Sequence, residues 1–399
     1  MRNRPLYRAV KAFAVIATGL SLDCAPRPGI AGDRTATQPA GFTRAAALDR
    51  AFRRGFIDRC GRVVVPPRYE GAFAFHEGVA CVSVRAAHGY AGLSGYIDRS
   101  GNVTILLMFP DAGSFYDGLA PFWSSGRSGF MNRDGVELFR LPPGRDAGRF
   151  SEGLASFVQS NGETKSAGFI DTSGRVVVEP RFDLALEFAG GFALVRQSVG
   201  GVQRVGFIDH AGHLAIPAMF VDALPFSEGL ASVRFNARAD SWGAVNAEGR
   251  EVIPPHFVSL GAFHEGRAIA RDRVDDDKRW LIIDAEGKFL ATLSCKSVRD
   301  FHDGRAVVED PAGEHGFRII DQAGRFIGAK YEFIEDFSEG LAAFETGADT
   351  WTSLFGYIDT SGGVAIPARF VTAAPFSEGL AAVGLYREGS GGIRDATAP

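Results

Sequence analysis

The sequence predicts an all-β protein built from nine tandem units, and a recurring phrase with a regular spacing supports this fold class. The phrase reads Phe-Ser-Glu-Gly-Leu-Ala at Phe150–Ala155, Phe226–Ala231, Phe337–Ala342 and Phe376–Ala381. Edited copies begin at Phe75, Phe115, Phe188, Phe263 and Phe301, so successive copies start 35 to 40 residues apart. A period of this length indicates a repeat architecture, in which each unit needs its neighbours to bury its apolar face.

A second phrase, Gly-[Phe/Tyr]-Ile-Asp-x-x-Gly, precedes every copy of the first. Clear copies are Gly55–Gly61, Gly95–Gly101, Gly168–Gly174, Gly206–Gly212 and Gly356–Gly362, and weaker ones are Gly129–Gly135, Gly243–Gly249, Leu281–Gly287 and Arg318–Gly324. Asp or Asn at the first turn position accepts backbone N–H groups, and Gly at the fourth adopts a positive φ. Each copy therefore predicts a strand followed by a hairpin turn.

The returning strand is rich in β-branched residues, as in Val176-Val177-Val178, and we expect proline to stop it. The stops are Pro66, Pro110, Pro142, Pro180, Pro217, Pro254 and Pro367. In six units an aromatic residue follows: Tyr69, Phe182, Phe220, Phe257, Tyr331 or Phe370. The unit is completed by a connection, the Phe-x-Glu-Gly phrase and a third strand in which apolar and polar residues alternate. The sequence therefore predicts units of about 37 residues, each with three short strands.

We expect the units to form an open, superhelical array, because no unit is visibly split between the two ends of the chain. A β-propeller is the alternative. A period near 40 residues suits propeller blades, although nine blades exceed the usual range.

Charge and composition exclude some classes of partner. The chain has a formal net charge of −4 and a mean hydropathy of +0.01. It lacks the basic footprint of a nucleic-acid-binding protein, so we expect no nucleic-acid partner. The 50 Gly and 33 Phe, against 8 Tyr and 4 Trp, match many turns with one recurring aromatic anchor.

The N-terminal segment predicts export. Arg2, Arg4, Arg8 and Lys11 precede an uncharged apolar run over residues 12–22, which is too short to span a membrane and suits a secretory signal. We expect cleavage before Gly32, with a lipid anchor at Cys24 as the alternative. Residues 1–31 are then a signal peptide, 32–51 a flexible linker, 52–386 the repeat array and 387–399 a C-terminal tail, in a periplasmic or extracellular protein without a membrane span in its mature chain.

Three cysteines remain beyond this leader: Cys60, Cys81 and Cys295. Their odd number and irregular spacing argue against a disulfide framework or a zinc site. A disulfide between Cys60 and Cys81 stays open, because both lie in the first repeat.

These phrases resemble the WG-repeat family of bacterial proteins, whose units combine a Gly-Tyr-Ile-Asp hairpin with a Phe-Ser-Glu-Gly-Leu-Ala phrase. The likeness runs from Phe52 to about Tyr386. It departs at the tryptophan that names the family, because only Trp242-Gly243 keeps the pair and Trp280 stands beside Leu281. The resemblance implies an exported or surface repeat scaffold and supplies no catalytic residues.

The residues most open to a chemical role are the carboxylates of the first phrase. One interpretation is a ladder that binds cations; the favoured one is that each carboxylate receives N–H bonds within its own turn. The carboxylates are Glu77, Asp117, Glu152, Glu228, Glu265, Asp303, Glu339 and Glu378, with Gly190 in the remaining unit. One carboxylate per unit is not a calcium site, which takes several oxygens from one loop.

Histidines and one acidic run are the other candidates. His76, His264 and His302 occupy a position where Ser stands in four units, which favours an exposed hydrogen-bonding role. His210 and His213 flank one turn glycine, and Asp275-Asp276-Asp277 reads as a solvated loop. No G-x-S-x-G, Walker A, H-E-x-x-H or EF-hand pattern is present. The members of a Ser/His/Asp triad need not be neighbours in sequence, and nothing in the sequence selects one. We therefore expect no catalytic, cofactor-binding or metal-binding residues, and no cofactor.

Connections between the third strand of one unit and the next hairpin vary most: Arg85–Ser94, Gln159–Ala167, Gln197–Val205, Asn236–Ser241 and Thr346–Phe355. We expect them to crowd one side of the array and to form a contact surface. The sequence thus predicts an exported, non-enzymatic scaffold that binds a protein or a cell-envelope ligand. A structural envelope spacer and a polymer-acting hydrolase or lyase are the alternatives.

Overall fold

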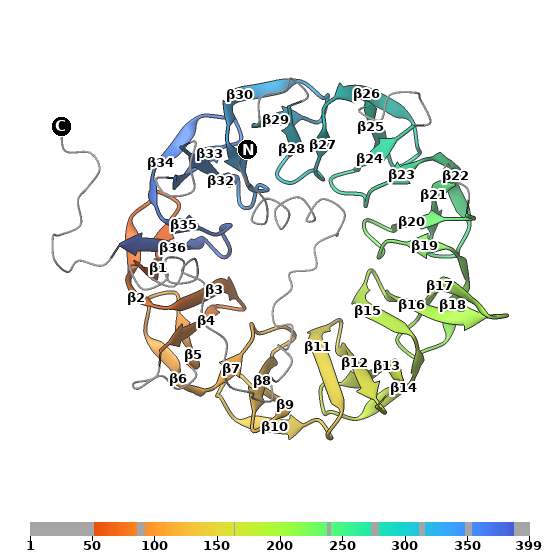
Figure 1. The fold of residues 1–399 in the computed structure, drawn as a ribbon, viewed down its shortest axis with the longest axis horizontal. Helices are drawn as coiled ribbons and strands as arrows, with labels where there is room; N and C mark the ends of the chain where they lie inside the picture. The colour runs from red at the N-terminus through yellow and green to blue at the C-terminus, as the bar shows by residue number, and fades with distance from the viewer. Residues whose placement is uncertain are drawn as a thin grey trace, which may run out of the picture.

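A computed structural model describes residues 52–85, 92–162, 164–237, 241–272, 279–310, 316–347 and 353–386. The described residues form nine four-stranded antiparallel sheets arranged as the blades of a β-propeller around a central opening (Figure 1). They contain no helix, and hence no helix long and apolar enough to cross a membrane. The all-β prediction is confirmed, and the arrangement is the propeller alternative.

Each blade is named here by its place along the chain. The strands of blades 1 to 4 are β3 (Gly71–His76), β4 (Val79–Val84), β5 (Leu93–Asp98) and β6 (Val103–Phe109); β7 (Asp111–Ala112), β8 (Ala120–Ser124), β9 (Arg127–Met131) and β10 (Glu137–Arg140); β11 (Arg145–Ser151), β12 (Leu154–Ser160), β13 (Lys165–Asp171) and β14 (Val176–Phe182); and β15 (Leu184–Ala189), β16 (Phe192–Val199), β17 (Val202–Ile208) and β18 (Leu214–Phe220).

Blades 5 to 8 repeat this order. Their strands are β19 (Asp222–Ala223), β20 (Leu230–Arg234), β21 (Trp242–Asn246) and β22 (Glu251–Phe257); β23 (Ser259–Leu260), β24 (Arg267–Arg271), β25 (Arg279–Asp284) and β26 (Phe289–Ser294); β27 (Ser297–Val298), β28 (Arg305–Glu309), β29 (Phe317–Asp321) and β30 (Phe326–Tyr331); and β31 (Phe333–Ile334), β32 (Leu341–Thr346), β33 (Leu354–Asp359) and β34 (Val364–Phe370).

Blade 9 is divided between the two ends of the described chain. Its sheet has the order β2–β1–β36–β35, in which β1 (Phe52–Asp58) and β2 (Val63–Tyr69) pair with β36 (Leu380–Tyr386) and β35 (Thr372–Ala373). The pairing of β1 with β36 runs from Phe52↔Tyr386 to Asp58↔Leu380. The open array is therefore wrong. Each repeat in the sequence begins in the middle of a blade, so the first and last halves complete one another and close the ring.

Each unit has four strands rather than three. The additional strand is the innermost of its blade (Figure 1). It begins before the Phe-x-Glu-Gly phrase, and β3, β11 and β15 continue into the first two residues of the phrase. In six blades, including β19 and β35, it has only two residues. Such a short strand has no alternation pattern, so the sequence reads as a connection.

Proline does not stop the outer strand in most blades. β2, β14, β18, β22 and β34 continue through Pro66, Pro180, Pro217, Pro254 and Pro367, whereas Pro110 and Pro142 follow their strands. In β18, Ile216 pairs with Phe207 and Phe220 pairs with Val205, so the segment around Pro217 forms a bulge. The outer strand has no neighbour on its outer side, and a missing N–H is tolerated there.

The glycine that opens the second phrase allows this bulge to lie close to the third strand. A Cβ added to Gly206 would lie 2.7 Å from the Ile216 carbonyl oxygen and 2.7 Å from the Ala218 nitrogen. Blade 6 has Leu281 at this position, and there β26 pairs residue by residue with β25 over Arg279–Ile282. Backbone atoms of the bulge therefore fill the space that a side chain at Gly206 would need, although blade 7 forms the same bulge with Arg318 at this position.

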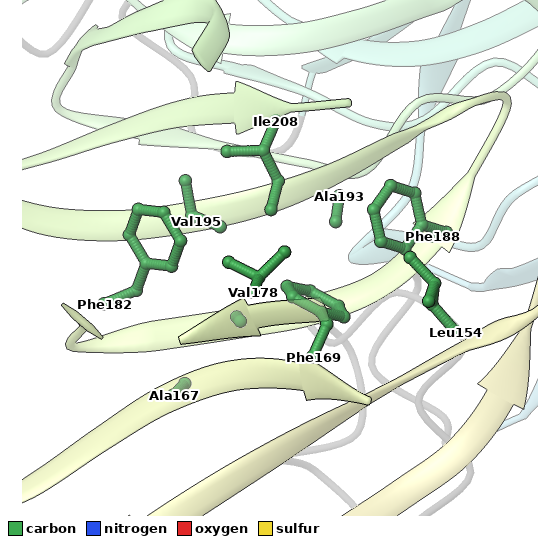
Figure 2. Close-up of a cluster of buried hydrophobic side chains, with 10 residues drawn as sticks. Leu154, Ala167, Phe169, Val178, Phe182, Phe188, Ala193, Val195 and Ile208 are labelled. Carbon is green, nitrogen blue, oxygen red and sulfur yellow. The ribbon is translucent and has the colours of Figure 1, made fainter. Parts of the chain in front are cut away.

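The core lies between blades and joins the two sequence phrases. Figure 2 shows this for blades 3 and 4, where Phe169 of β13 and Phe188 of β15 lie together among Val178, Val195 and Ile208. Their ring centroids are 5.0 Å apart in an edge-to-face arrangement. The same contact recurs at 4.8 to 4.9 Å for Phe56–Phe75, Tyr96–Phe115, Phe130–Phe150, Phe207–Phe226 and Tyr357–Phe376. Such pairs contribute about 0.5–1.5 kcal/mol beyond area burial.

Candidate functional site

The antiparallel order of the strands gives the ring two unlike faces. The turn face carries the Glu-Gly turns between first and second strands and the Asp-x-x-Gly turns between third and fourth strands. The loop face carries the connections between second and third strands and those between successive blades. Every variable connection predicted to crowd one side starts and ends at the loop face. Residues 86–91, 163, 238–240 and 348–352 within them, and Asp275-Asp276-Asp277, lie outside the described residues.

The Asp-x-x-Gly turns have the predicted geometry. In the first of them, Asp58 Oδ1 accepts the N–H groups of Cys60 and Arg62, each at 2.9 Å, and Gly61 has φ +79°. Hydrogen bonds lower the pKa of several of these aspartates. For Asp98 the side-chain bond from Asn102 is the main cause, and it outweighs the opposing effect of burial on the pKa.

The Glu-Gly turns are two-residue hairpins. Ser227 and Leu230 exchange backbone hydrogen bonds of 2.9 and 3.0 Å around Glu228 and Gly229, which both have positive φ. This is the signature of a type I′ turn. The eight carboxylate residues of the phrase all have φ between +52° and +55°, a conformation that costs a side-chain-bearing residue about 1–2 kcal/mol.

The phrase carboxylates link neighbouring blades, so the interpretation that each serves its own turn is wrong. Glu77 accepts the N–H of Gly118 in the next blade, and Glu228 accepts the N–H groups of Glu265 and Gly266. Glu378 accepts the Gly78 N–H at 2.9 Å and continues the series across the closure. The eight links have shortest N···O distances of 2.7 to 3.1 Å. We call this series the carboxylate ring; Gly190 leaves it without a link from blade 4 to blade 5.

Serine hydroxyls form a parallel set of links. Ser151, Ser227, Ser338 and Ser377 each donate to the carbonyl oxygen of the phrase phenylalanine in the next blade, over 2.5 to 2.8 Å. These are the four units with the unaltered phrase. The hydroxyl and the carboxylate of one turn therefore both bind the following turn, which explains why Ser and Glu occur together.

In blades 1 and 6, where histidine stands in place of serine, the histidine side chain contacts the side chain at the same position of the next blade. His76 Nε2 lies 3.3 Å from the hydroxyl of Tyr116, which holds the same position in blade 2. Arg149 of β11 donates to that hydroxyl at 3.1 Å and pairs with Glu187 of β15 at 2.7 Å. A polar chain thus crosses blades 1 to 4 near the central opening.

A second polar group occupies blades 6 and 7. The rings of His264 and His302 lie 5.3 Å apart, and His264 Nε2 lies 3.9 Å from Asp300 Oδ2. Burial raises the pKa of Asp300, and the two histidines oppose that rise. Among the described residues, no group of three or more His, Cys, Asp or Glu side chains has an arrangement that could hold a metal ion.

The remaining candidates are separate from one another. His210 stacks on Phe188 with ring centroids 4.3 Å apart and lies 3.2 Å from Glu152, whereas His213 lies 3.4 Å from Asp209 of its own turn. Cys60 is exposed, Cys81 and Cys295 are buried, and all three are free thiols. Burial raises the pKa of Cys295 to about 12. The pair His210 and His213 therefore does not converge, and Cys60 and Cys81 are not bonded.

One shallow cavity of about 300 Å³ lies between blades 5 and 6. Phe257, Leu281 and Ile283 form its apolar floor, and His256 and Arg279 lie at its margin. It occurs where blade 6 has Leu281 and the regular β26 in place of glycine and a bulge. The departure from the repeat pattern at Leu281 is the sequence signal for this cavity.

The protein is a β-propeller built from sequence repeats. Three features define this class: the ring of blades, blade 9 formed by strands from both ends of the described chain, and the links between turns. A family model for the WG containing repeat matches residues 55–85, 95–122, 168–198, 206–238, 242–273, 318–348 and 355–385. The chain therefore belongs to the WG-repeat family. A comparison with curated proteins gives no match.

Solved structures with similar folds are distant in sequence. A eukaryotic initiation factor is 10% identical, with a TM-score of 0.48 over 68% of this chain and 81% of that one. BamB from Moraxella catarrhalis is 12% identical, with a TM-score of 0.35 over 60% and 79%. An acylaminoacyl peptidase from Pyrococcus horikoshii is 10% identical, with a TM-score of 0.37 over 76% and 53%. Likenesses at this level say nothing about ligand or activity.

Proposed function

We propose that this protein is an exported, non-enzymatic scaffold whose loop face binds a protein or another cell-envelope ligand. The observation that carries the proposal is the contrast between the two faces. The turn face is built from near-copies of two tight turns: the Asp-x-x-Gly turns are closed by bonds within each turn, and the Glu-Gly turns carry the links that hold neighbouring blades together. The loop face carries the connections that differ in length and sequence, where a rigid scaffold places its contact residues.

Charge and apolar groups at the loop face support a binding role. In blade 4, β16 and β17 extend to a Gly200-Gly201 turn and expose Val199 and Val202 to 47% and 48%. Arg196 and Arg204 stand on the same two strands. Apolar side chains beside positive charge at the end of a rigid hairpin suit a contact with a protein surface.

The localisation part of the proposal rests on the N-terminal segment. A basic start and a short apolar run direct the chain out of the cytoplasm, with cleavage before Gly32 or lipidation at Cys24. Fractionation of producing cells, with mass spectrometry of the mature N-terminus, tests this part. Recovery of the chain in the cytoplasm with residues 1–31 intact contradicts export.

Site-specific photo-crosslinking in the producing cells tests the contact surface. Photoreactive residues at Val199 or Gln203 on the loop face are expected to capture a defined partner, and the same residue at Thr172 or Ser361 on the turn face is the matched control. All four positions are exposed. Equal capture from both faces refutes the loop face as the contact surface, and no capture from either face favours the envelope spacer.

A further inference from the structure

The boundary between blades 4 and 5 has neither of the two links that the Glu-Gly turns make elsewhere. At eight boundaries the phrase carboxylate accepts an N–H of the next turn. At four of these the phrase serine also donates to the carbonyl oxygen of the next phrase phenylalanine. Blade 4 has Ala189 and Gly190 at the positions of the serine and the carboxylate. The sequence itself therefore interrupts both sets of links here.

The turn of blade 5 that faces this interruption is built like the other turns. Glu228 and Gly229 have φ of +52° and +81°, and the rings of Phe226 and Phe207 make the recurring contact at 4.9 Å. Phe192 of blade 4 also packs on Phe226, with ring centroids 4.9 Å apart. Apolar packing thus holds blades 4 and 5 together (Figure 1) and keeps the polar groups of the turn in place.

Three backbone groups of this turn are unpaired within the described part of the chain. They are the N–H groups of Glu228 and Gly229 and the carbonyl oxygen of Phe226. Gly190 and Gly229 are exposed, and Ala189 is half-buried. Among the described residues, a Cβ built on Gly229 would have no atom within 4 Å, and one on Gly190 would meet only the Phe226 Cβ, at 3.4 Å. Solvent, and therefore a ligand, can reach these groups.

The next boundary shows which chemistry fits such groups. There the carboxylate of Glu228 binds the N–H groups of Glu265 and Gly266 over 2.7 and 2.8 Å. The preceding residue, Ser227, donates its hydroxyl to the Phe263 carbonyl oxygen over 2.5 Å. Successive N–H groups of a turn form a concave site for an anion. A bond to a charged acceptor is roughly twice as strong as a neutral one, so a carboxylate competes with water there.

We propose that the turn of blade 5 is a binding site for a carboxylate with a hydrogen-bond donor on the neighbouring residue, as in a Ser-Glu pair of a peptide. The carboxylate binds the N–H groups of Glu228 and Gly229, and the hydroxyl donates to the Phe226 carbonyl oxygen. The ligand replaces the two side-chain functions that Ala189 and Gly190 do not supply. This site lies on the turn face, so it is independent of the contact surface proposed for the loop face.

The surroundings of the site set a modest affinity. Ala247 stands at the position from which Arg133 and His210 reach a phrase carboxylate in other blades. The site therefore offers N–H groups without a cation, and we expect a dissociation constant on the order of 1 mM. An anion without the hydroxyl makes only the bonds to the N–H groups, so it should bind more weakly than the peptide.

NMR of the isotope-labelled full chain tests the site through the amide of Gly229. Titration with N-acetyl-Ser-Glu-amide should give a saturable shift of this signal. N-acetyl-Ser-Gln-amide, which keeps the shape without the charge, should bind at least about tenfold more weakly, and so should acetate. The Gly379 amide is the internal control, because Glu339 already binds it, and its signal should not move.

Two variants move the site. Gly190→Glu supplies the carboxylate from within the chain and should abolish the shift at Gly229. Ser338→Ala with Glu339→Gly makes the converse change between blades 8 and 9, and the Gly379 amide should then respond to the peptide. The proposal is overturned by a Gly229 signal that does not move or that persists in shifting after Gly190→Glu. Equal binding of the Ser-Glu and Ser-Gln peptides, or of acetate and the Ser-Glu peptide, also overturns it.

Discussion

Replacing Glu228 by alanine should weaken the ring at the boundary between blades 5 and 6. Its carboxylate accepts two N–H bonds from the next blade, of 2.7 Å from Glu265 and 2.8 Å from Gly266. Bonds to charged groups contribute about 1.5–3 kcal/mol each when shielded from water. Glu228 is exposed, so solvent screening reduces this contribution. We expect a loss of about 1–2 kcal/mol in the free energy of unfolding.

Hydrogen exchange is the sharpest assay for this change, because repeat proteins do not always unfold in one step. The Gly266 amide should exchange faster in Glu228→Ala, and the melting temperature should fall by about 2–4 °C for each kcal/mol lost, or somewhat less in a chain of this size. Glu248→Ala is the control, because Glu248 is equally exposed on the turn face and its side chain makes none of the inter-blade bonds. Equal effects of the two substitutions would refute the carboxylate ring as a source of stability.

The converse substitution is Gly190→Glu, at the one turn of the nine that lacks a carboxylate. Gly190 already has φ +62°, close to the values of the eight acidic residues. The new carboxylate should accept the Gly229 N–H and complete the ring. A link of about 1–2 kcal/mol is offset by a backbone cost of about 1–2 kcal/mol, so the Gly229 amide should exchange more slowly while the melting temperature changes little. Unchanged exchange of the Gly229 amide would contradict this reasoning.

Three other predictions concern titration and reactivity. The pKa of Asp98 is lowered by its hydrogen bonds, chiefly that from the Asn102 side chain, so its contribution to stability is present above about pH 3.8 and is lost as pH falls through the folded-state pKa. Acid unfolding of Asp98→Asn should be correspondingly less steep, while the turn should persist because Asn132 and Asn246 occupy it elsewhere. The pKa of Asp300 is raised by burial, so ionisation of Asp300 opposes folding at neutral pH. Asp300→Asn should therefore raise the melting temperature at pH 7, and the difference from the unaltered chain should disappear below about pH 3.8. A destabilised variant would indicate that His264 and His302 require the charge. Under native conditions a thiol reagent should modify Cys60 and leave Cys81 and Cys295 unmodified until denaturation, as peptide mapping can establish, because the last two are buried.

Local chemistry was predictable from the sequence, whereas contacts between units were not. The Asp58–Gly61 turn follows from residue types at fixed spacing, and so does the strand before it. The partner of Glu228 could not be predicted, because it lies in the next blade and depends on how blades pack. The recurring carboxylate was visible; the atoms it binds were not.

Ring closure shows the same limit. The paired phrases identify nine units, but they start in mid-blade, so the half-blades at the two ends resemble complete repeats. The innermost strands, such as Asp222–Ala223, are too short to show periodicity. The prediction that proline ends the outer strand is wrong at Pro217, because the sequence does not show that this strand has a free outer edge.

Direct imaging of single particles tests the central claim, that β1 and β36 close nine blades into a ring. Electron microscopy of the purified chain should give class averages of a closed ring with nine lobes and a central opening. In Phe56→Asp, which places a charge in the buried pairing of Phe56 with Ala382, the ring should open beside blade 9. Arcs or superhelical segments of the unaltered chain would contradict the account.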